Sequence, residues 1–143
     1  HGPRGGDELN LLVAGANYGW PLATHGIDYS GAKISGHKSL PGMEDPVRVW
    51  VPSISPSGLC FYTGDRFPQW KGNFFTAGPA GQQLARLTLK GTTVVSEETL
   101  VPQMGRIRDV RQGLDGYIYL VTEDRDGKPT PIYRLEPVER GTR

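Results

Sequence analysis

The stretch SPSGLCFYTGDRFPQWKGNFFTAG, residues 55–78, holds two short aromatic runs, GLCFYTG and GNFFTAG, each bounded by glycine. Such runs between turn residues are typical of β-strands. Similar runs recur along the chain: VRVWVPSI (47–54), QLARLTLKG (83–91), TTVVSEETLV (92–101), IRDVRQG (107–113), GYIYLVTE (116–123) and PIYRLEPV (131–138). Windows in which apolar residues recur with helical periodicity are nearly absent. The sequence therefore predicts an all-β protein, with a hairpin that turns at Lys90-Gly91.

Two segments, 55–78 and 112–137, resemble each other. Gly58 precedes Phe61 and Tyr62 much as Gly116 precedes Tyr117 and Tyr119, and LARLTL corresponds to IYRLEP. An offset of about 58 residues, from Gly58 to Gly116, indicates β-propeller blades of about four strands each. We expect a loop-rich segment at 1–46, one blade at 47–101, a last blade at 103–137 and a tail at 138–143. Because propellers need at least about four blades to close a ring, the chain looks incomplete.

The composition excludes several classes of protein. Sixteen Lys+Arg against fifteen Asp+Glu give a formal net charge of +1, so no basic excess indicates nucleic-acid binding. The terminal Arg140 and Arg143 are interpreted as part of a frayed tail. No stretch approaches the ~20 apolar residues that span a bilayer, and no signal peptide is visible. Twenty glycines and twelve prolines in 143 residues fit an all-β chain with many tight turns.

The lone cysteine, Cys60, lies in an alternating run and is predicted to be a buried structural residue. No Ser/His/Asp order, glycine-rich phosphate loop or Cys/His zinc spacing is present. The residues alone therefore predict no catalytic centre.

Several motifs together carry a family resemblance: HGPRGGDELNLL (1–12), GANYGWP (15–21), PSISPSGLCFYTGDRFPQWKGNFF (52–75) and GRIRDVRQGLDGYIYLVTE (105–123). Over residues 1–137, and in the same order, they resemble the carboxy-terminal part of the soluble PQQ-dependent aldose sugar dehydrogenases, which are related to soluble glucose and sorbosone dehydrogenases. The resemblance implies part of a six-bladed β-propeller. Because family members are more than twice as long, it also implies that the first blades lie outside this chain. Whether the chain is a fragment or a naturally short gene product stays open.

The same resemblance implies an activity and a location. Family members oxidise the C1 hydroxyl of an aldose sugar by hydride transfer to the quinone of PQQ, which Ca²⁺ holds and polarises, and an external electron acceptor then takes the electrons. They act outside the cytoplasm, so a periplasmic or secreted protein is expected.

The segment GPRGGDE (2–8) is the first candidate site. Its glycines let the backbone approach a ligand closely, and carbonyl and carboxylate oxygens are the ligands that Ca²⁺ prefers. The resemblance implies that the carbonyls of Gly2 and Pro3 hold the calcium that clamps PQQ, with Asp7 close behind. The residues alone favour a turn followed by a strand, in which Asp7 and Glu8 are solvated, and only the resemblance favours the calcium site.

A structural calcium site is the second candidate. The resemblance implies that the Glu8 and Asp28 side chains and the Tyr18 and Thr24 carbonyls bind this ion. Oxygen ligands from separate segments would tie the loop-rich lead together. The alternative is that Asp28 simply starts a turn at DYSG.

The run RIRDVRQG (106–113) is the third candidate site. In a regular strand Arg106 and Arg108 share one face, ~7 Å apart, while Ile107, Asp109 and Arg111 share the other. The resemblance implies that Arg106 and Arg108 contact PQQ, whose three carboxylates suit guanidinium groups. The alternatives are a solvated strand face or ion pairs with Asp65, Glu123 or Asp124.

Two features depart from the family pattern. Many members carry a cofactor-contacting lysine where this chain has Ala80, so that cofactor affinity is reduced or Gln82 or Gln83 takes part. The family's general base is a histidine upstream of His1; His25 and His37 are interpreted as surface residues and His1 as preceding the calcium loop. No catalytic residue is therefore expected in this chain, which by itself is predicted to be inactive.

Two functions remain open at this stage. The first is the cofactor-binding portion of a PQQ- and calcium-dependent aldose sugar dehydrogenase. The second is a non-catalytic propeller module that self-associates to cover its open strand edges and binds a sugar or a protein. Exposed edges predict an oligomer, with a dimer as the simplest form, unless missing blades cover them.

Overall fold

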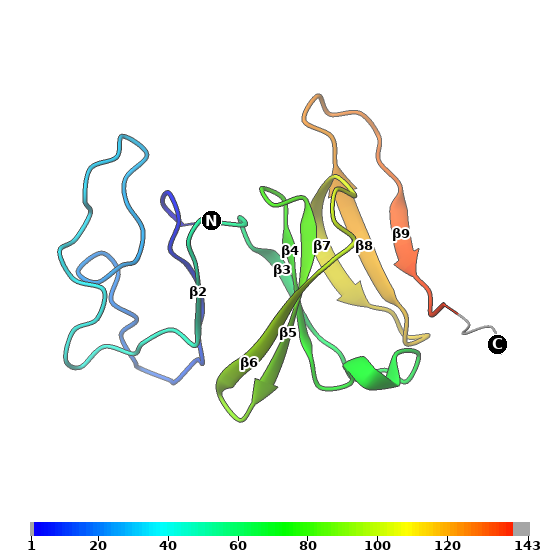
Figure 1. Ribbon diagram of the computed structural model, residues 1–143, viewed down its shortest axis with the longest axis horizontal. Coiled ribbons are helices and arrows are strands. Elements are labelled where there is room, and N and C mark those ends of the chain that lie inside the picture. The colour runs from blue at the N-terminus through cyan, green and yellow to red at the C-terminus, as the bar shows by residue number, and fades with distance from the viewer. Residues whose placement is uncertain (1, 139–143) are drawn as a thin grey trace.

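The computed structural model describes residues 2–138; His1 and residues 139–143, which include Arg140 and Arg143, lie outside the described part. Its strands form three antiparallel sheets, which follow one another along the chain (Figure 1). The first sheet has two strands, the second four and the third three. In chain order the strands are β1 (Asp7–Leu9), β2 (Arg48–Trp50), β3 (Ser57–Phe61), β4 (Phe74–Gly78), β5 (Gln83–Lys90), β6 (Thr93–Leu100), β7 (Arg106–Gln112), β8 (Ile118–Glu123) and β9 (Ile132–Leu135).

The four-stranded sheet has the order β3-β4-β5-β6, so each strand pairs with its sequence neighbour. Its last two strands form the predicted hairpin: Lys90 is opposite Thr93, and Gly91 takes the positive φ of 61° that the tight turn requires. Between β3 and β4, Pro68–Trp70 forms one 3-10 turn, and no α-helix occurs within residues 2–138. The all-β prediction is confirmed.

The three-stranded sheet, β7-β8-β9, corrects the repeat that the sequence suggested. Gly58 lies at the start of the first strand of its sheet, whereas Gly116 precedes β8, the second strand of the other. The equivalent of Gly116 is Gly72, which precedes β4; both glycines have a φ of 80°. The offset of 58 residues is therefore wrong, because aromatic runs after a glycine occur on both the first and second strands.

The hydrophobic core lies between the four-stranded and three-stranded sheets. Along β8 alternate residues are buried, as the period of two along a strand requires, whereas β4 is buried throughout from Phe75 to Gly78 and β7 buries Ile107 and Val110. Its fully buried members include Tyr62, Phe75, Leu84, Ile107 and Leu120. Trp70 packs against Phe75, with ring centroids 5.6 Å apart. This core fixes the position of β7 against β3.

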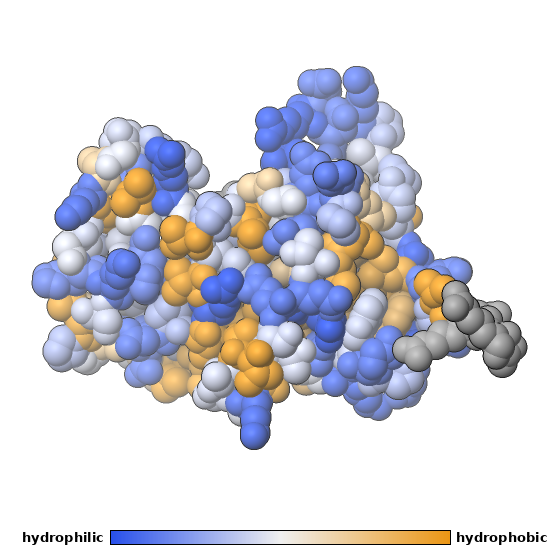
Figure 2. All heavy atoms as spheres, in the orientation of Figure 1, coloured by the Kyte–Doolittle hydropathy of each residue, from blue (hydrophilic) through white to orange (hydrophobic). Residues whose placement is uncertain are grey.

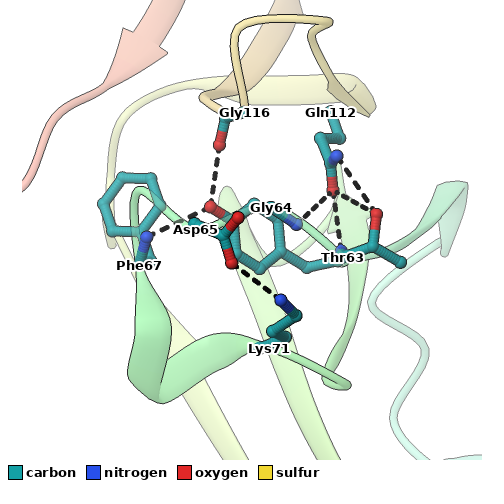
Figure 3. A network of polar contacts seen from close by, with 8 residues as sticks. Thr63, Gly64, Asp65, Phe67, Lys71, Gln112 and Gly116 are labelled. Atoms are coloured by element: carbon teal, nitrogen blue, oxygen red, sulfur yellow. Dashed lines mark hydrogen bonds and ion pairs between the residues drawn. The ribbon is translucent and has the colours of Figure 1, made fainter.

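A polar network fastens the two sheets at one edge of this core (Figure 3). The hydroxyl of the buried Tyr62 donates to the Gly116 carbonyl at 2.7 Å and accepts from the Phe67 N–H at 3.1 Å. The side-chain oxygen of Gln112, on β7, accepts from the backbone N–H groups of Thr63 and Gly64 at 2.8 and 3.1 Å. These bonds satisfy backbone groups that the short strands leave unpaired.

The loop-rich lead, residues 10–47, joins β1 to β2 and contains neither helix nor strand. It forms a lobe beside the sheets (Figure 1). The small sheet β1–β2 is tied to β6 through Glu97, whose carboxylate accepts from Arg48 at 2.6 Å and from the Trp50 indole at 2.9 Å. Over the described residues no helix is long and apolar enough to cross a membrane.

Candidate functional site

The GPRGG segment lies against the lead at residues 24–27. Arg4 and Ile27 exchange backbone hydrogen bonds of 2.9 and 3.2 Å. Gly6 and Gly26 meet with no room for side chains: a Cβ on Gly6 would lie 2.3 Å from the Gly26 nitrogen, and Gly6 has a φ of 80°. Glycine is required at Gly6 both by this conformation and by the close approach of the two backbones.

A cavity of about 310 Å³ lies beside the loop. Its lining brings together most of the predicted calcium and cofactor residues: Gly2, Pro3, Asp7, Glu8, Tyr18 and Thr24. These residues come from two stretches of the chain, 2–8 and 18–24, so only the tertiary structure makes them neighbours. Their assignment as ligands stays a prediction, but their juxtaposition is an observed property of the fold.

Asp7 supplies a buried carboxylate to the wall of this cavity. The residue is 6% exposed, because β1 places its side chain beneath the loop. One carboxylate oxygen accepts from the Gly2 N–H at 2.7 Å, and the other, Oδ2, is buried without a hydrogen-bond partner in the described structure. A buried carboxylate oxygen without a partner is costly unless a cation or a donor meets it.

The remaining donors of this cavity suit a hard cation. Within residues 2–138 no three His, Cys, Asp or Glu side chains group together, so a metal here would depend on backbone carbonyls as well as on Asp7 and Glu8. Ca²⁺ accepts such mixed oxygen sets. The Glu8 carboxylate is already near Asn10, which donates to it at 3.2 Å. The residues present therefore fit calcium.

Asp28 lies apart from the first cavity. It lines a second one, of about 670 Å³, together with Gly2, Pro3, Trp20 and Ile34. Its Oδ1 accepts from the Ser30 N–H and hydroxyl at 2.8 and 2.6 Å, and these bonds lower the pKa of the exposed carboxyl group. The turn that the sequence suggested at DYSG is confirmed, whereas calcium binding by Asp28 stays a prediction.

Arg106 and Arg108, at the start of β7, converge on one carboxylate. Arg106 lies 2.7 Å and Arg108 3.0 Å from the two oxygens of Glu123 on β8, which is one of the ion pairs that the sequence left open. All three side chains are partly exposed. Glu123 thereby holds two guanidinium groups side by side, an arrangement that a carboxylate-bearing ligand can use.

The regular strand expected at residues 106–113 is wrong in one respect. A β-bulge lies between Ile107 and Asp109, so the buried residue after Ile107 is Val110 instead of Asp109. Asp109 and Arg111 now pair with each other at 3.1 Å on the other side. One inserted residue reverses the alternation, because side chains alternate with a period of two.

The positions that depart from the family pattern lie at the same end of the sheets as Arg106. Ala80, in the β4–β5 turn, donates its N–H to the Ile54 carbonyl at 3.1 Å and lines a third cavity. Gln82 is exposed with a φ of 48°, and its carbonyl accepts from Gln103 at 3.0 Å. The Gln83 side-chain oxygen accepts from Thr99 at 3.2 Å. Nothing in this arrangement assigns a cofactor role to either glutamine.

The remaining titratable candidates are also placed. His37 is exposed, while His25 is half-buried and lines the third cavity, a position that surface character alone did not predict. Cys60 is buried, as expected, and burial raises the pKa of its thiol. A raised pKa disfavours the nucleophilic thiolate.

The chain is similar to known proteins. Residues 1–134 match the family model of the glucose/sorbosone dehydrogenases. The chain belongs to this family. The resemblance found in the sequence is thereby confirmed.

Individual relatives are also sugar dehydrogenases by name. The aldose sugar dehydrogenase YliI of Escherichia coli (strain K12) is 44% identical over 131 residues, which cover 90% of this chain and 35% of the relative. The crystal structure of a glucose dehydrogenase superposes with a TM-score of 0.88 at 49% identity, and the match covers 96% of this chain and 40% of that protein. The PQQ-bound aldose sugar dehydrogenase of Streptomyces coelicolor gives a TM-score of 0.67 at 30% identity, with 94% and 37% covered. This family member thus spans well under half the length of these relatives.

Proposed function

We propose that this chain forms the calcium- and PQQ-binding portion of an aldose sugar dehydrogenase with β-propeller architecture. The observation that carries the proposal is the buried, partnerless Oδ2 of Asp7 in a cavity shared with Gly2 and Pro3. Membership of the family and similarity to a PQQ-bound aldose sugar dehydrogenase support it. The four-stranded and three-stranded sheets would be its two blades, with the lead attached to β1 and β2.

In this proposal each group of residues has a separate task. The carbonyls of Gly2 and Pro3, with Asp7 behind them, bind the cation, since the close approach of the 2–6 loop to residues 24–27 fixes their position. Arg106 and Arg108 bind and orient cofactor carboxylates, and Glu123 keeps their guanidinium groups together beforehand. When bound, PQQ supplies the two-electron quinone chemistry that accepts hydride from the sugar C1 carbon. The proton of the C1 hydroxyl requires a base that we do not assign to any residue of this chain.

The test is a titration of the purified chain with PQQ, with and without Ca²⁺, followed by calorimetry and absorbance. We expect calcium-dependent binding, weakened about tenfold or more when Arg106 and Arg108 are both replaced by alanine, because hydrogen bonds to charged groups are lost. Arg86→Ala is the matched control, because it breaks a similar ion pair, with Glu98 on β6, away from the site.

A second part of the experiment tests the calcium site. Asp7→Asn removes the charge at the partnerless oxygen with little change in shape, so we expect weaker Ca²⁺ binding and weaker PQQ binding at limiting calcium. Asp115→Asn, on the β7–β8 turn, is the control. If PQQ binding does not depend on calcium, or if the double arginine variant binds as the parent does, the proposal fails.

A second candidate function rests on the outer face of the three-stranded sheet. Val121 and Ile132 lie opposite each other on β8 and β9 and are 40% and 69% exposed. Apolar residues on an uncovered sheet face favour association, here with a second copy of the chain. The module would then bind a sugar or protein without turnover. Light scattering that finds a monomer at every concentration contradicts this candidate.

The first proposal also includes a periplasmic or secreted location, an aldose substrate and an external electron acceptor.

A further inference from the structure

The third cavity lies on the other side of the 2–6 loop from Asp7. Its volume is about 610 Å³, and Pro3 lines both this cavity and the one beside Asp7. The polar residues of its wall are Arg4, His25, Tyr29, Ser53 and Ser55, while residues such as Ile27 and Val51 supply apolar surface. Within the described part of the chain its wall contains neither Asp nor Glu. The loop therefore separates an acidic cavity from a basic one. Figure 2 shows a hollow at the top of the view, between the lobe of the lead on the left and the loops at the upper end of the sheets on the right.

Arg4 is the cation of this wall. Its side chain makes no hydrogen bond or ion pair with any residue in the range 2–138, unlike Arg106 and Arg108, which have Glu123. Its backbone is nevertheless fixed, because both its N–H and its carbonyl bond to Ile27. A guanidinium group on a fixed backbone, beside a cavity without acidic residues, is suited to bind an anion.

The neighbouring groups narrow the class of anion. Tyr29 is 75% exposed and offers an aromatic face with a hydroxyl at its edge. The Ser53 hydroxyl oxygen accepts from the Ser55 N–H at 2.7 Å, which leaves its hydrogen free to donate. Such a mixed wall fits an organic carboxylate better than a bare inorganic ion.

We propose that this cavity binds an organic carboxylate through Arg4. Two sources share this chemistry: a carboxylate of PQQ, or the carboxylate of an acidic aldose such as a uronic acid. If the ligand is PQQ, the inference rests on the proposed function. PQQ would then contact the cation beside Asp7 and place a carboxylate beside Arg4, and Pro3 lines both cavities. If the ligand is the sugar, the inference names acidic aldoses as the substrate class of the proposed dehydrogenase.

The experiment compares the parent chain with Arg4→Gln at low ionic strength by calorimetry, with D-glucuronate, D-glucose and PQQ plus Ca²⁺ as separate probes. Lys33→Gln is the matched control, because Lys33 is an exposed cation of the lead outside this cavity. Circular dichroism and thermal melts check that each variant folds. We expect Arg4→Gln to weaken binding of at least one carboxylate probe about tenfold or more, with glucose binding and the Lys33→Gln variant unaffected.

The outcomes separate the sources and the two proposals. Loss confined to glucuronate assigns the cavity to an acidic sugar, and loss confined to PQQ assigns it to the cofactor. Glucuronate binding that depends on Arg4 while PQQ does not bind supports this inference and overturns the proposed function. Calcium-dependent PQQ binding that Arg4→Gln leaves intact, with glucuronate binding absent or unchanged in the variant, overturns this inference and leaves the proposed function standing. Absence of binding by every carboxylate probe overturns both.

Discussion

The lead and the paired sheets are held together by different means. The sheets β3–β6 and β7–β9 enclose a core of fully buried side chains such as Phe75 and Leu120. The lead between residues 10 and 47 has no strand and exposes apolar residues, among them Leu12 at 83% and Trp20 at 61%. It is attached to the 2–6 loop by the pair of backbone hydrogen bonds between Arg4 and Ile27 and by the close contact of Gly6 with Gly26. The packed sheets thus carry Arg106 and Arg108, whereas the residues predicted to bind calcium lie in the 2–8 segment and in the lead.

The largest expected effect tests the packed side of this comparison. Phe75→Ala removes a fully buried ring from the core and should lower the free energy of unfolding by about 3–5 kcal/mol. Leu12→Ala, in the lead, should change it by less than about 0.5 kcal/mol, because Leu12 is already in water. Urea titrations of both variants measure the difference, and comparable losses would contradict the division into a packed and a loosely held region.

The next effect tests how the lead is attached. Gly6→Ala places a methyl group 2.3 Å from the Gly26 nitrogen and also strains a φ of 80°. Gly15→Ala is the matched control, because Gly15 has a φ of 76° but nothing within 4 Å of its added Cβ. The control should cost about 1–2 kcal/mol from backbone strain alone, and Gly6→Ala about 1–3 kcal/mol more. Hydrogen exchange should show faster exchange at the Arg4 and Ile27 amides in Gly6→Ala; equal behaviour of the two variants would refute the close approach.

A smaller effect is expected at the joint between the sheets. Tyr62→Phe removes the hydroxyl between the Gly116 carbonyl and the Phe67 N–H and leaves the ring in place (Figure 3). The unfolding free energy should fall by about 1–3 kcal/mol, since two backbone groups lose a partner. The exposed Tyr29→Phe is the control for loss of a hydroxyl and should be nearly neutral. A neutral Tyr62→Phe would show that this hydroxyl does not help to join the sheets.

The smallest effect belongs to the surface. The hydrogen bond from Lys71, at 2.7 Å, lowers the pKa of the exposed Asp65 carboxyl group. A lowered folded-state pKa contributes stability that is present above the unfolded value of about 3.9 and is lost as the pH falls through the folded value. Lys71→Met should therefore slightly reduce the loss of stability on acidification below about pH 4, as measured by the thermal midpoint at a series of pH values. An unchanged acid profile would show that the pair is fully screened.

The course of the strands was predictable because each depends on local pattern. Runs such as GNFFTAG and LARLTLKGTTVVSEE carry alternation and turn residues within a few positions, and the protein forms the strands expected from them. The short β1 was less evident, because three residues of mixed polarity carry little periodicity. The bulge at Arg108 was also unforeseen, since it depends on how β7 meets β8.

What the sequence determined by itself was the all-β class, the Lys90-Gly91 hairpin and, through several motifs in order, the family. What only the tertiary structure decided was which residues come together: Asp7 beneath Gly2, Gly6 against Gly26, Arg106 and Arg108 on Glu123, and Arg4 and Ala80 in the wall of one cavity. Strand patterns arise from neighbours in the chain, whereas these contacts close loops of many residues, and their geometry depends on the packing of segments that no local pattern relates.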